Sequence, residues 1–188
     1  MIRTMLVGLL LMSLTASGQE VTTHSYREDD VDFRRYRTYF WASQALSQRD
    51  EGSYFLNDLV LKSDVRDAVH GELEGRGYRP NESDPDLLVN FRVVGKDVML
   101  RGPNGYGPAY WEKGELFSND SRRNEIKVNA GTLIISLLDR NAGKVVWEGF
   151  ASGVIEKNEF KINEGKIREA VNLIFEEYGN RVDEYTRR

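Results

Sequence analysis

Two apolar runs joined by a short polar turn constrain the fold of this chain most strongly. Residues 131–139 are nearly continuous in leucine and isoleucine, and residues 144–155 carry valine, tryptophan and phenylalanine. The intervening Arg140-Asn141-Ala142-Gly143 has the composition of a turn. The sequence therefore predicts a largely buried β-hairpin. Gly149 and Gly153 in its second arm predict β-bulges.

Four further segments have the spacing of regular structure. Residues 31–41 predict one half-buried strand with an irregularity near Tyr36, and residues 86–94 predict a central strand covered on both faces. Residues 57–77 and 163–178 place apolar side chains at positions i, i+3 and i+4, which predicts two amphipathic helices.

The order strand, helix, strand, strand, strand, helix favours an α+β fold. We expect a single domain over residues 31–182, with a twisted, mainly antiparallel sheet and both helices packed on one face. Residues 19–30 are expected to be a flexible N-terminal segment. A chain of 188 residues can bury a hydrophobic core of ordinary size, so the fold does not need disulfide bonds for stability.

The first residues have the character of a secretory signal peptide. Arg3 precedes an apolar stretch, and Ala16-Ser17-Gly18 resembles a cleavage site before Gln19. The stretch of about ten apolar residues is too short to span a bilayer, which takes roughly twenty. We therefore expect residues 1–18 to be removed and the protein to be periplasmic or secreted, with no transmembrane span. A lipid anchor would require a cysteine where Gln19 stands.

Composition excludes several kinds of chemistry. The net charge is -4 and no run of lysine or arginine forms a phosphate-binding stripe, so nucleic acid is not an expected partner. With no cysteine and two histidines, thiolate and imidazole metal sites and cofactor sites are not expected. Asp29, Asp30 and Asp32 lack the ligand spacing of a calcium loop and are interpreted as a solvated strand entry.

Residues 95–130 form a connection too long for an ordinary loop. Residues 98–100 and 126–128 predict an antiparallel ribbon, and residues 102–117 its tip. The tip is rich in glycine and proline, and four of its aromatic side chains are candidate contacts with a protein or glycan partner. These are Tyr106, Tyr110, Trp111 and Phe117. The alternative is a tip that packs on itself.

No catalytic constellation stands out. Asp84 and Asp86 flank Pro85, and with Glu115 they are the candidate carboxylates for acid/base work on a polymer, although the spacing around a proline is typical of a turn. His70 is interpreted as a helix-surface residue with acidic neighbours, because no Gly-x-Ser-x-Gly motif accompanies it.

Several short motifs follow one another along the chain in a characteristic order and spacing. They are Val31-Asp32-Phe33, Tyr36, Thr38-Tyr39, Trp41, Ala68-Val69, Leu73, Gly77-Tyr78, Pro85-Asp86-Leu87-Leu88-Val89, Gly131-Thr132-Leu133-Ile134-Ile135, Leu137, Asp139, Val146-Trp147 and Gly149. Together these motifs resemble the DUF4136 domain family, bacterial envelope proteins of unknown function that are often lipoproteins. The resemblance implies an envelope location and an α+β fold, and it brings no catalytic residues. Gln19 departs from the lipidated cysteine of the lipoprotein members.

Three functions remain open at this point. The first is a non-catalytic envelope module that binds a protein or glycan through the 95–130 excursion. The second is a hydrolase of envelope polymers that uses carboxylates such as Asp84, Asp86 or Glu115. The third is a structural subunit that contacts its neighbours through a sheet edge.

Overall fold

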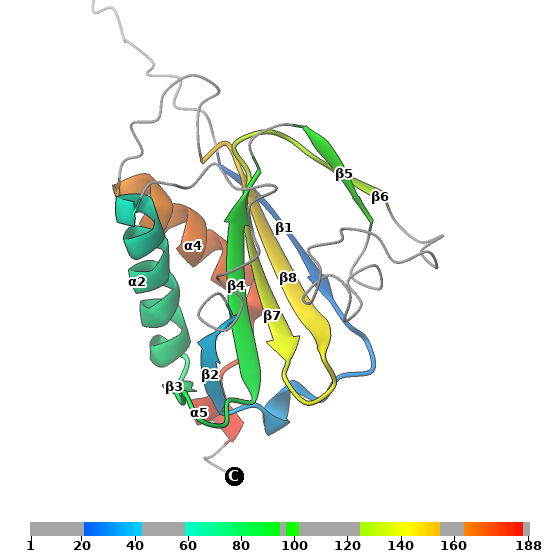
Figure 1. The fold of residues 1–188 in the computed structure, drawn as a ribbon, viewed down its shortest axis with the longest axis vertical. Coiled ribbons are helices and arrows are strands. Elements are labelled where there is room, and N and C mark those ends of the chain that lie inside the picture. Colours follow the sequence, from blue (N-terminus) through cyan, green and yellow to red (C-terminus); the bar gives the residue numbers. More distant parts are fainter. Residues whose placement is uncertain (1–20, 43–58, 95–96, 102–124, 155–163, 186–188) are drawn as a thin grey trace, which may run out of the picture.

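The computed structural model describes residues 21–42, 59–94, 97–101, 125–154 and 164–185 (Figure 1). The strands are β1 (Thr22–Arg27), β2 (Thr38–Trp41), β3 (Arg79–Pro80), β4 (Leu87–Val93), β5 (Val98–Arg101), β6 (Glu125–Val128), β7 (Leu133–Asp139) and β8 (Lys144–Ser152). The helices are the 3-10 turn η1 (Phe33–Arg35), α2 (Leu59–Gly75), α4 (Glu164–Tyr178) and the short α5 (Val182–Tyr185).

Six strands form one sheet in the order β1-β8-β7-β4-β2-β3. The pairs from β1 to β4 are antiparallel, whereas β2 runs parallel to both β4 and β3. Helices α2 and α4 lie together on one side of this sheet, and the β5–β6 ribbon projects from its other side (Figure 1). The expected α+β fold, with a mainly antiparallel sheet and two helices on one face, is confirmed.

The hairpin β7–β8 is confirmed, but its β-bulge does not lie at Gly149 or Gly153, where the sequence predicts one. Leu137 pairs with Trp147 and Leu138 pairs with Val145, so the extra residue of the second arm is Val146. Gly149 has a different role: a Cβ atom there would lie 2.5 Å from Ile174 Cγ2 and 2.5 Å from Trp147 Cη2. Helix α4 approaches the sheet at Gly149, and a glycine gives it room.

The expectation of a flexible segment over residues 19–30 is wrong, because strand β1 lies within it. β1 pairs with β8 along its whole length, from Thr22 opposite Ser152 to Arg27 opposite Trp147. Its sequence is polar on both faces, so it lacks the apolar alternation by which strands are recognised. The sheet therefore begins before Val31, where the sequence analysis placed the start of the domain.

The single strand expected over residues 31–41 is also corrected. Its first part is η1, where the Asp32 side chain accepts a hydrogen bond from the backbone N–H of Arg34. This arrangement lets Phe33 and Tyr36, three residues apart, both enter the core at 3% and 2% exposure. The strand itself is limited to β2.

The core lies between the sheet and the two helices. Apolar residues of α2 and α4 at helical spacing are buried against inward-facing side chains of β2, β4, β7 and β8. An aromatic cluster occupies its centre: Phe33, Tyr36, Tyr78, Trp147, Phe175 and Tyr178. Tyr78 and Tyr178 satisfy each other there through a hydrogen bond of 2.7 Å between their hydroxyls. Within the described ranges, no helix has the length and apolar character of a membrane span.

Candidate functional site

Asp86 lies just before β4 and its carboxylate is occupied by the neighbouring strand. Its Oδ2 accepts hydrogen bonds from the backbone N–H of Arg37 at 2.8 Å and of Thr38 at 2.9 Å, and from the Thr38 hydroxyl at 2.9 Å. The Thr38 hydroxyl oxygen in turn lies 3.0 Å from the Asp86 backbone nitrogen and accepts its hydrogen. Asp86 therefore joins the start of β2 to the start of β4, where the two strands begin to run parallel.

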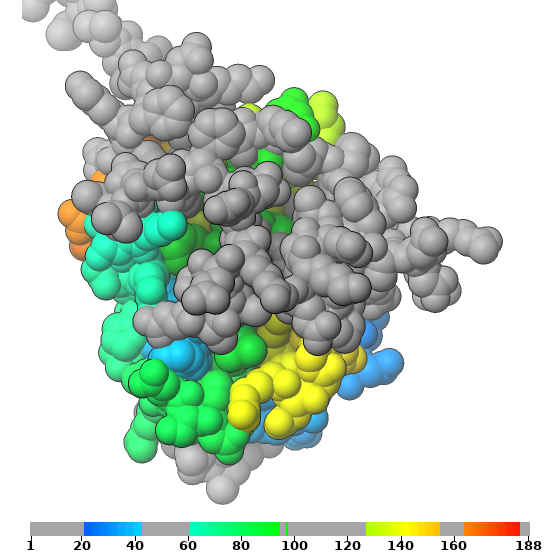
Figure 2. Space-filling model, viewed as in Figure 1, coloured from blue at the N-terminus to red at the C-terminus, as the bar shows by residue number. Residues whose placement is uncertain are grey.

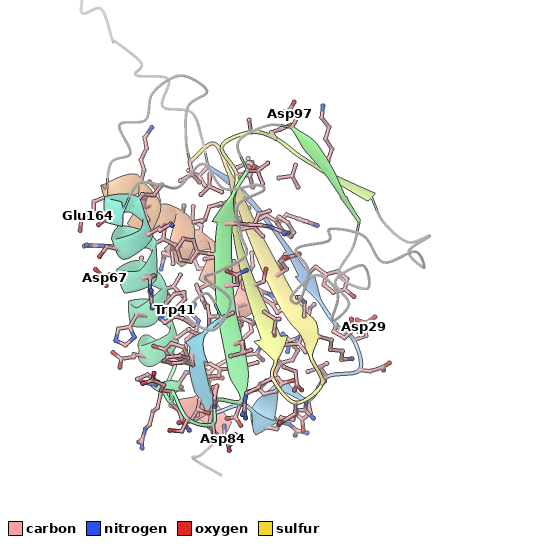
Figure 3. All side chains as sticks on the ribbon, viewed as in Figure 1. Asp29, Trp41, Asp67, Asp84, Asp97 and Glu164 are labelled. Carbon is pink, nitrogen blue, oxygen red and sulfur yellow. The ribbon has the colours of Figure 1, made fainter. Side chains whose placement is uncertain are left out.

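Two more carboxylates lie at this end of the sheet, where Figure 2 shows the β7–β8 turn (yellow) beside the segment leading into β4 (green). Asp139 is 1% exposed, accepts 2.8 Å hydrogen bonds from the Tyr36 hydroxyl and the Ala142 backbone N–H, and pairs with Arg35. Asp84 is exposed and pairs with Arg140 across the same end (Figure 3). Each of these contacts holds a turn or a strand end in place.

The candidate carboxylates are thus brought near one another but are not arranged for acid/base work. Asp86 and Asp84 make separate structural contacts, and the Asp86 oxygen already accepts three hydrogen bonds. A glycosidase pair needs two carboxyl groups that face each other across a substrate. Glu115 lies outside the described residues.

His70 lies on the exposed side of α2 and joins a buried tyrosine to the surface. The Tyr39 hydroxyl is 2.5 Å from His70 Nδ1, and His70 Nε2 is 3.2 Å from Glu74 Oε2. The acidic neighbour Glu74 was expected from its spacing on the helix, but Tyr39 was not. The signal was present in β2, where alternation directs Tyr39 and Trp41 towards the helices and Trp41 meets Arg66 at 4.8 Å.

This contact predicts how stability responds to alkaline pH. Burial, with a smaller effect of Glu74, raises the pKa of Tyr39 to about 12, above the value of about 10 in an unfolded chain. A raised folded pKa stabilises the fold below about pH 10 and loses this contribution as pH rises towards 12. We expect Tyr39→Phe to weaken the alkaline loss of stability, measured as the urea midpoint from about pH 8 to about pH 11. The pKa values of Tyr26 and Tyr178 are also raised, so part of the alkaline loss of stability should remain in the variant. A pH profile identical to that of the unmodified protein would contradict the prediction for Tyr39.

A charged pair is buried on the sheet face away from the helices. Arg92 Nη2 lies 3.4 Å from Glu148 Oε1, which also accepts a 2.6 Å hydrogen bond from the Ser136 hydroxyl. Arg92, Ser136 and Glu148 are 7%, 5% and 2% exposed. Burial raises the pKa of Glu148, while Arg92 and Ser136 oppose this shift. The hairpin prediction identified a buried arm but gave no reason to expect an ionisable residue inside it.

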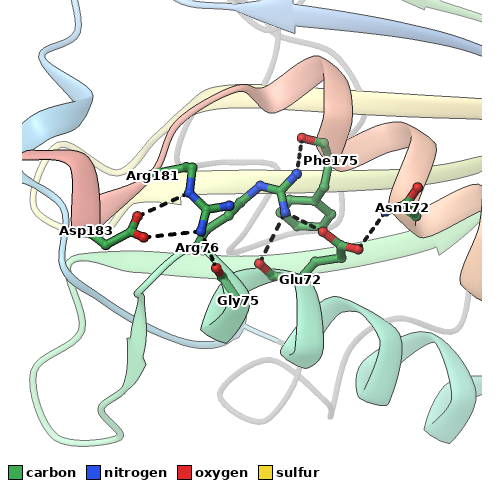
Figure 4. A network of polar contacts seen from close by, with 7 residues as sticks. All are labelled: Glu72, Gly75, Arg76, Asn172, Phe175, Arg181 and Asp183. Atoms are coloured by element: carbon green, nitrogen blue, oxygen red, sulfur yellow. Dashed lines mark hydrogen bonds and ion pairs between the residues drawn. The ribbon is translucent and has the colours of Figure 1, made fainter.

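The C-terminal ends of α2 and α4 are joined by a polar network (Figure 4). Arg76 donates to the backbone carbonyl of Phe175 at 2.7 Å and pairs with Glu72, which accepts a 3.0 Å hydrogen bond from Asn172. Arg181 donates to the backbone carbonyl of Gly75 at 2.7 Å. The arginines thus satisfy carbonyls that a helix end leaves unpaired, and the network is structural.

The acidic residue Asp32 is engaged by contacts within its own turn. Asp32 caps η1 and holds Arg34 through a 2.7 Å contact to Nε, and its hydrogen bonds with Arg34 lower its pKa. In the described part of the chain, no group of three or more histidine or acidic residues is placed to hold a metal ion.

The base of the long excursion is described and matches its prediction. β5 and β6 form an antiparallel ribbon in which Val98 lies opposite Val128 and Arg101 opposite Glu125. Val94 and Val128 form a small apolar cluster with Ile134 and Phe150 of the main sheet. The candidate contacts Tyr106, Tyr110, Trp111 and Phe117 lie outside the described residues.

The domain has one sheet with helices on one face and the β5–β6 ribbon on the other, and its carboxylates make contacts at the strand ends. These features belong to the α+β class of domains. The sequence profile of the domain of unknown function DUF4136 matches residues 22–178, and the chain belongs to this family. Among curated proteins, none matches the sequence.

A solved structure of the same family shows this fold at low sequence identity. A crystal structure of a DUF4136 family protein from Bacteroides thetaiotaomicron is 16% identical, with a TM-score of 0.55 over 84% of this chain and 95% of that chain. A PDZ domain protein from Parabacteroides distasonis is 17% identical, with a TM-score of 0.49 over 85% of this chain and 36% of that one. The PelC dodecamer from Paraburkholderia phytofirmans is 8% identical, with a TM-score of 0.45 over 86% and 99%.

Proposed function

We propose that this protein is an exported, non-catalytic module of the cell envelope that binds a protein or glycan component. Its N-terminal segment supports export, because Arg3, an apolar stretch and small residues precede Gln19 in the order of a cleavable signal peptide.

The observation that carries the binding role is the ribbon at the base of the excursion. β5 and β6 hold Arg101 opposite Glu125, so both ends of the segment between them leave the domain from one place. That segment contains Tyr106, Tyr110, Trp111 and Phe117 among glycines and prolines. Aromatic side chains provide large contact areas at little entropic cost, and a loop on a rigid base is a common place for recognition.

The contacts of Asp84 and Asp86 favour binding over hydrolysis. Asp86 accepts three hydrogen bonds that fix the start of β2, so its use as a general base would compete with the sheet itself. Asp84 pairs with Arg140 on the exposed side of the same turn. Hydrolysis through Asp84 and Asp86 is therefore not retained as a second candidate.

The tip provides the test of the binding role. We expect replacement of Tyr106, Tyr110 and Trp111 with serine to leave the melting temperature nearly unchanged and to weaken capture of envelope proteins or isolated envelope glycan. Crosslinking and pull-down from intact envelopes measure capture, and mass spectrometry of the recovered protein checks for an N-terminus at or near Gln19.

A matched variant separates loss of aromatic area from disturbance of the loop. Phenylalanine at the same three positions retains most of the aromatic area, so capture should persist. A large fall in melting temperature with capture intact would mean that the three rings pack on the domain itself, and the binding role would be rejected.

A further inference from the structure

The two edges of the six-stranded sheet differ in how they could accept another strand. The edge strand β3 has two residues, Arg79 and Pro80, and a proline has no backbone N–H to donate. The opposite edge is β1, which has six residues without proline or glycine. Short strands and prolines are devices that prevent edge pairing, and β1 has neither.

The hydrogen-bonding direction of β1 follows from its register with β8. The backbone N–H of Glu28 donates to the carbonyl of Val146 at 3.0 Å, which makes these two residues a hydrogen-bonded pair. Alternation along an antiparallel ladder then directs the backbone groups of Thr22, His24 and Tyr26 towards β8. Those of Thr23, Ser25 and Arg27 point away from the sheet.

The outer side of β1 carries no strand in the part of the chain that the structure describes. Helix α4 covers β1 from the helix face, where Arg27 donates to Asn180 Oδ1 at 3.0 Å and approaches the Tyr178 carbonyl at 3.5 Å. These contacts hold the strand without using its outward backbone groups. Among the described residues, β1 is therefore a fixed strand whose outer edge pairs with no other strand.

We propose that β1 pairs antiparallel with β1 of a second copy of this chain, about a two-fold axis centred on Ser25. With this centre, Thr23 lies opposite Arg27 of the other copy and Ser25 lies opposite its own equivalent. All three residues with outward backbone groups then form hydrogen-bonded pairs, with about six backbone hydrogen bonds between the copies. A shift of the centre by one residue leaves two such pairs within the strand.

The side chains of β1 are compatible with a second copy as the occupant. In this register His24 lies opposite Tyr26 of the other copy, and Glu28 lies opposite Thr22, so like charges do not meet. A centre at Arg27 would place two arginines opposite each other and is disfavoured. This interface uses no residue of the 95–130 excursion, so it is independent of the proposed function.

Single cysteines test the register, because the chain has no cysteine of its own. Ser25→Cys places two cysteines in a hydrogen-bonded pair with Cα atoms about 5.5 Å apart, which suits a disulfide. His24→Cys is the matched control on the same strand: its two copies are diagonal neighbours, about 7 to 8 Å apart. We expect Ser25→Cys to form the covalent dimer at least about tenfold faster in a glutathione buffer. Equal rates, or faster crosslinking of His24→Cys, would overturn the register.

Solution size tests the interface without a covalent bond. Sedimentation of the purified protein should show a monomer–dimer equilibrium between about 1 µM and about 1 mM. Ser25→Pro removes one outward N–H and should remain monomeric with its fold retained, whereas Ser25→Ala keeps that N–H and should dimerise like the unmodified protein. A monomer at every concentration, or a Ser25→Pro dimer of unchanged affinity, would overturn the proposal. If Ser25→Pro does not fold, the cysteine comparison decides.

Discussion

Replacement of Trp147 with alanine is expected to lower the free energy of unfolding by about 3 to 5 kcal/mol. Trp147 is 1% exposed, and its ring centroid lies 4.9 Å from that of Tyr178 and 5.8 Å from that of Phe175. The side chain therefore joins β8 to α4 at the centre of the core. Urea denaturation, monitored by far-ultraviolet circular dichroism, measures the loss.

A more conservative substitution checks that the loss comes from packing. Trp147→Phe retains an aromatic ring and should cost clearly less than Trp147→Ala. A loss below about 1 kcal/mol for the alanine variant would mean that this ring is not part of the core, contrary to the contacts with Tyr178 and Phe175.

Helices and strands whose apolar side chains recur at regular spacing were predictable, because that spacing indicates which side chains are buried. The hairpin of β7 and β8 and the amphipathic helices α2 and α4 are of this kind. β1 is different, since its side chains are threonine, histidine, serine, tyrosine and arginine. Its place in the sheet comes from backbone pairing with β8, and the pattern of apolar side chains does not indicate that pairing.

The roles of polar residues were less predictable than the positions of apolar ones. Asp86 and Asp139 look alike in sequence as acids beside apolar runs, yet one joins two parallel strands and the other is buried under Tyr36. Both roles depend on partners about 50 or 100 residues away along the chain. A single sequence does not identify such partners, so Asp86 was grouped with Asp84 as a catalytic candidate although each has a structural task.

Replacement of Glu148 with leucine is expected to lower the free energy of unfolding by about 3 to 5 kcal/mol, because it removes the carboxylate that lies beside the buried guanidinium of Arg92. The substitution also removes the acceptor of the 2.6 Å hydrogen bond from Ser136. Chemical denaturation measures this loss.

The double variant Arg92→Leu with Glu148→Leu shows whether the pair itself stabilises the fold. Burial raises the pKa of Glu148 even though Arg92 lies beside it, so desolvation outweighs the attraction between the two charges. We therefore expect the double variant to recover to within about 1 kcal/mol of the unmodified protein, or to exceed it. If the double variant is as unstable as Glu148→Leu alone, the loss comes from altered packing at residue 148. The free-energy cost of burying the Arg92 guanidinium without Glu148 beside it would then not explain the loss. Recovery of stability in the double variant would instead mean that Arg92 and Glu148 are retained for a reason other than stability. The pair lies on the sheet face to which the β5–β6 ribbon is attached.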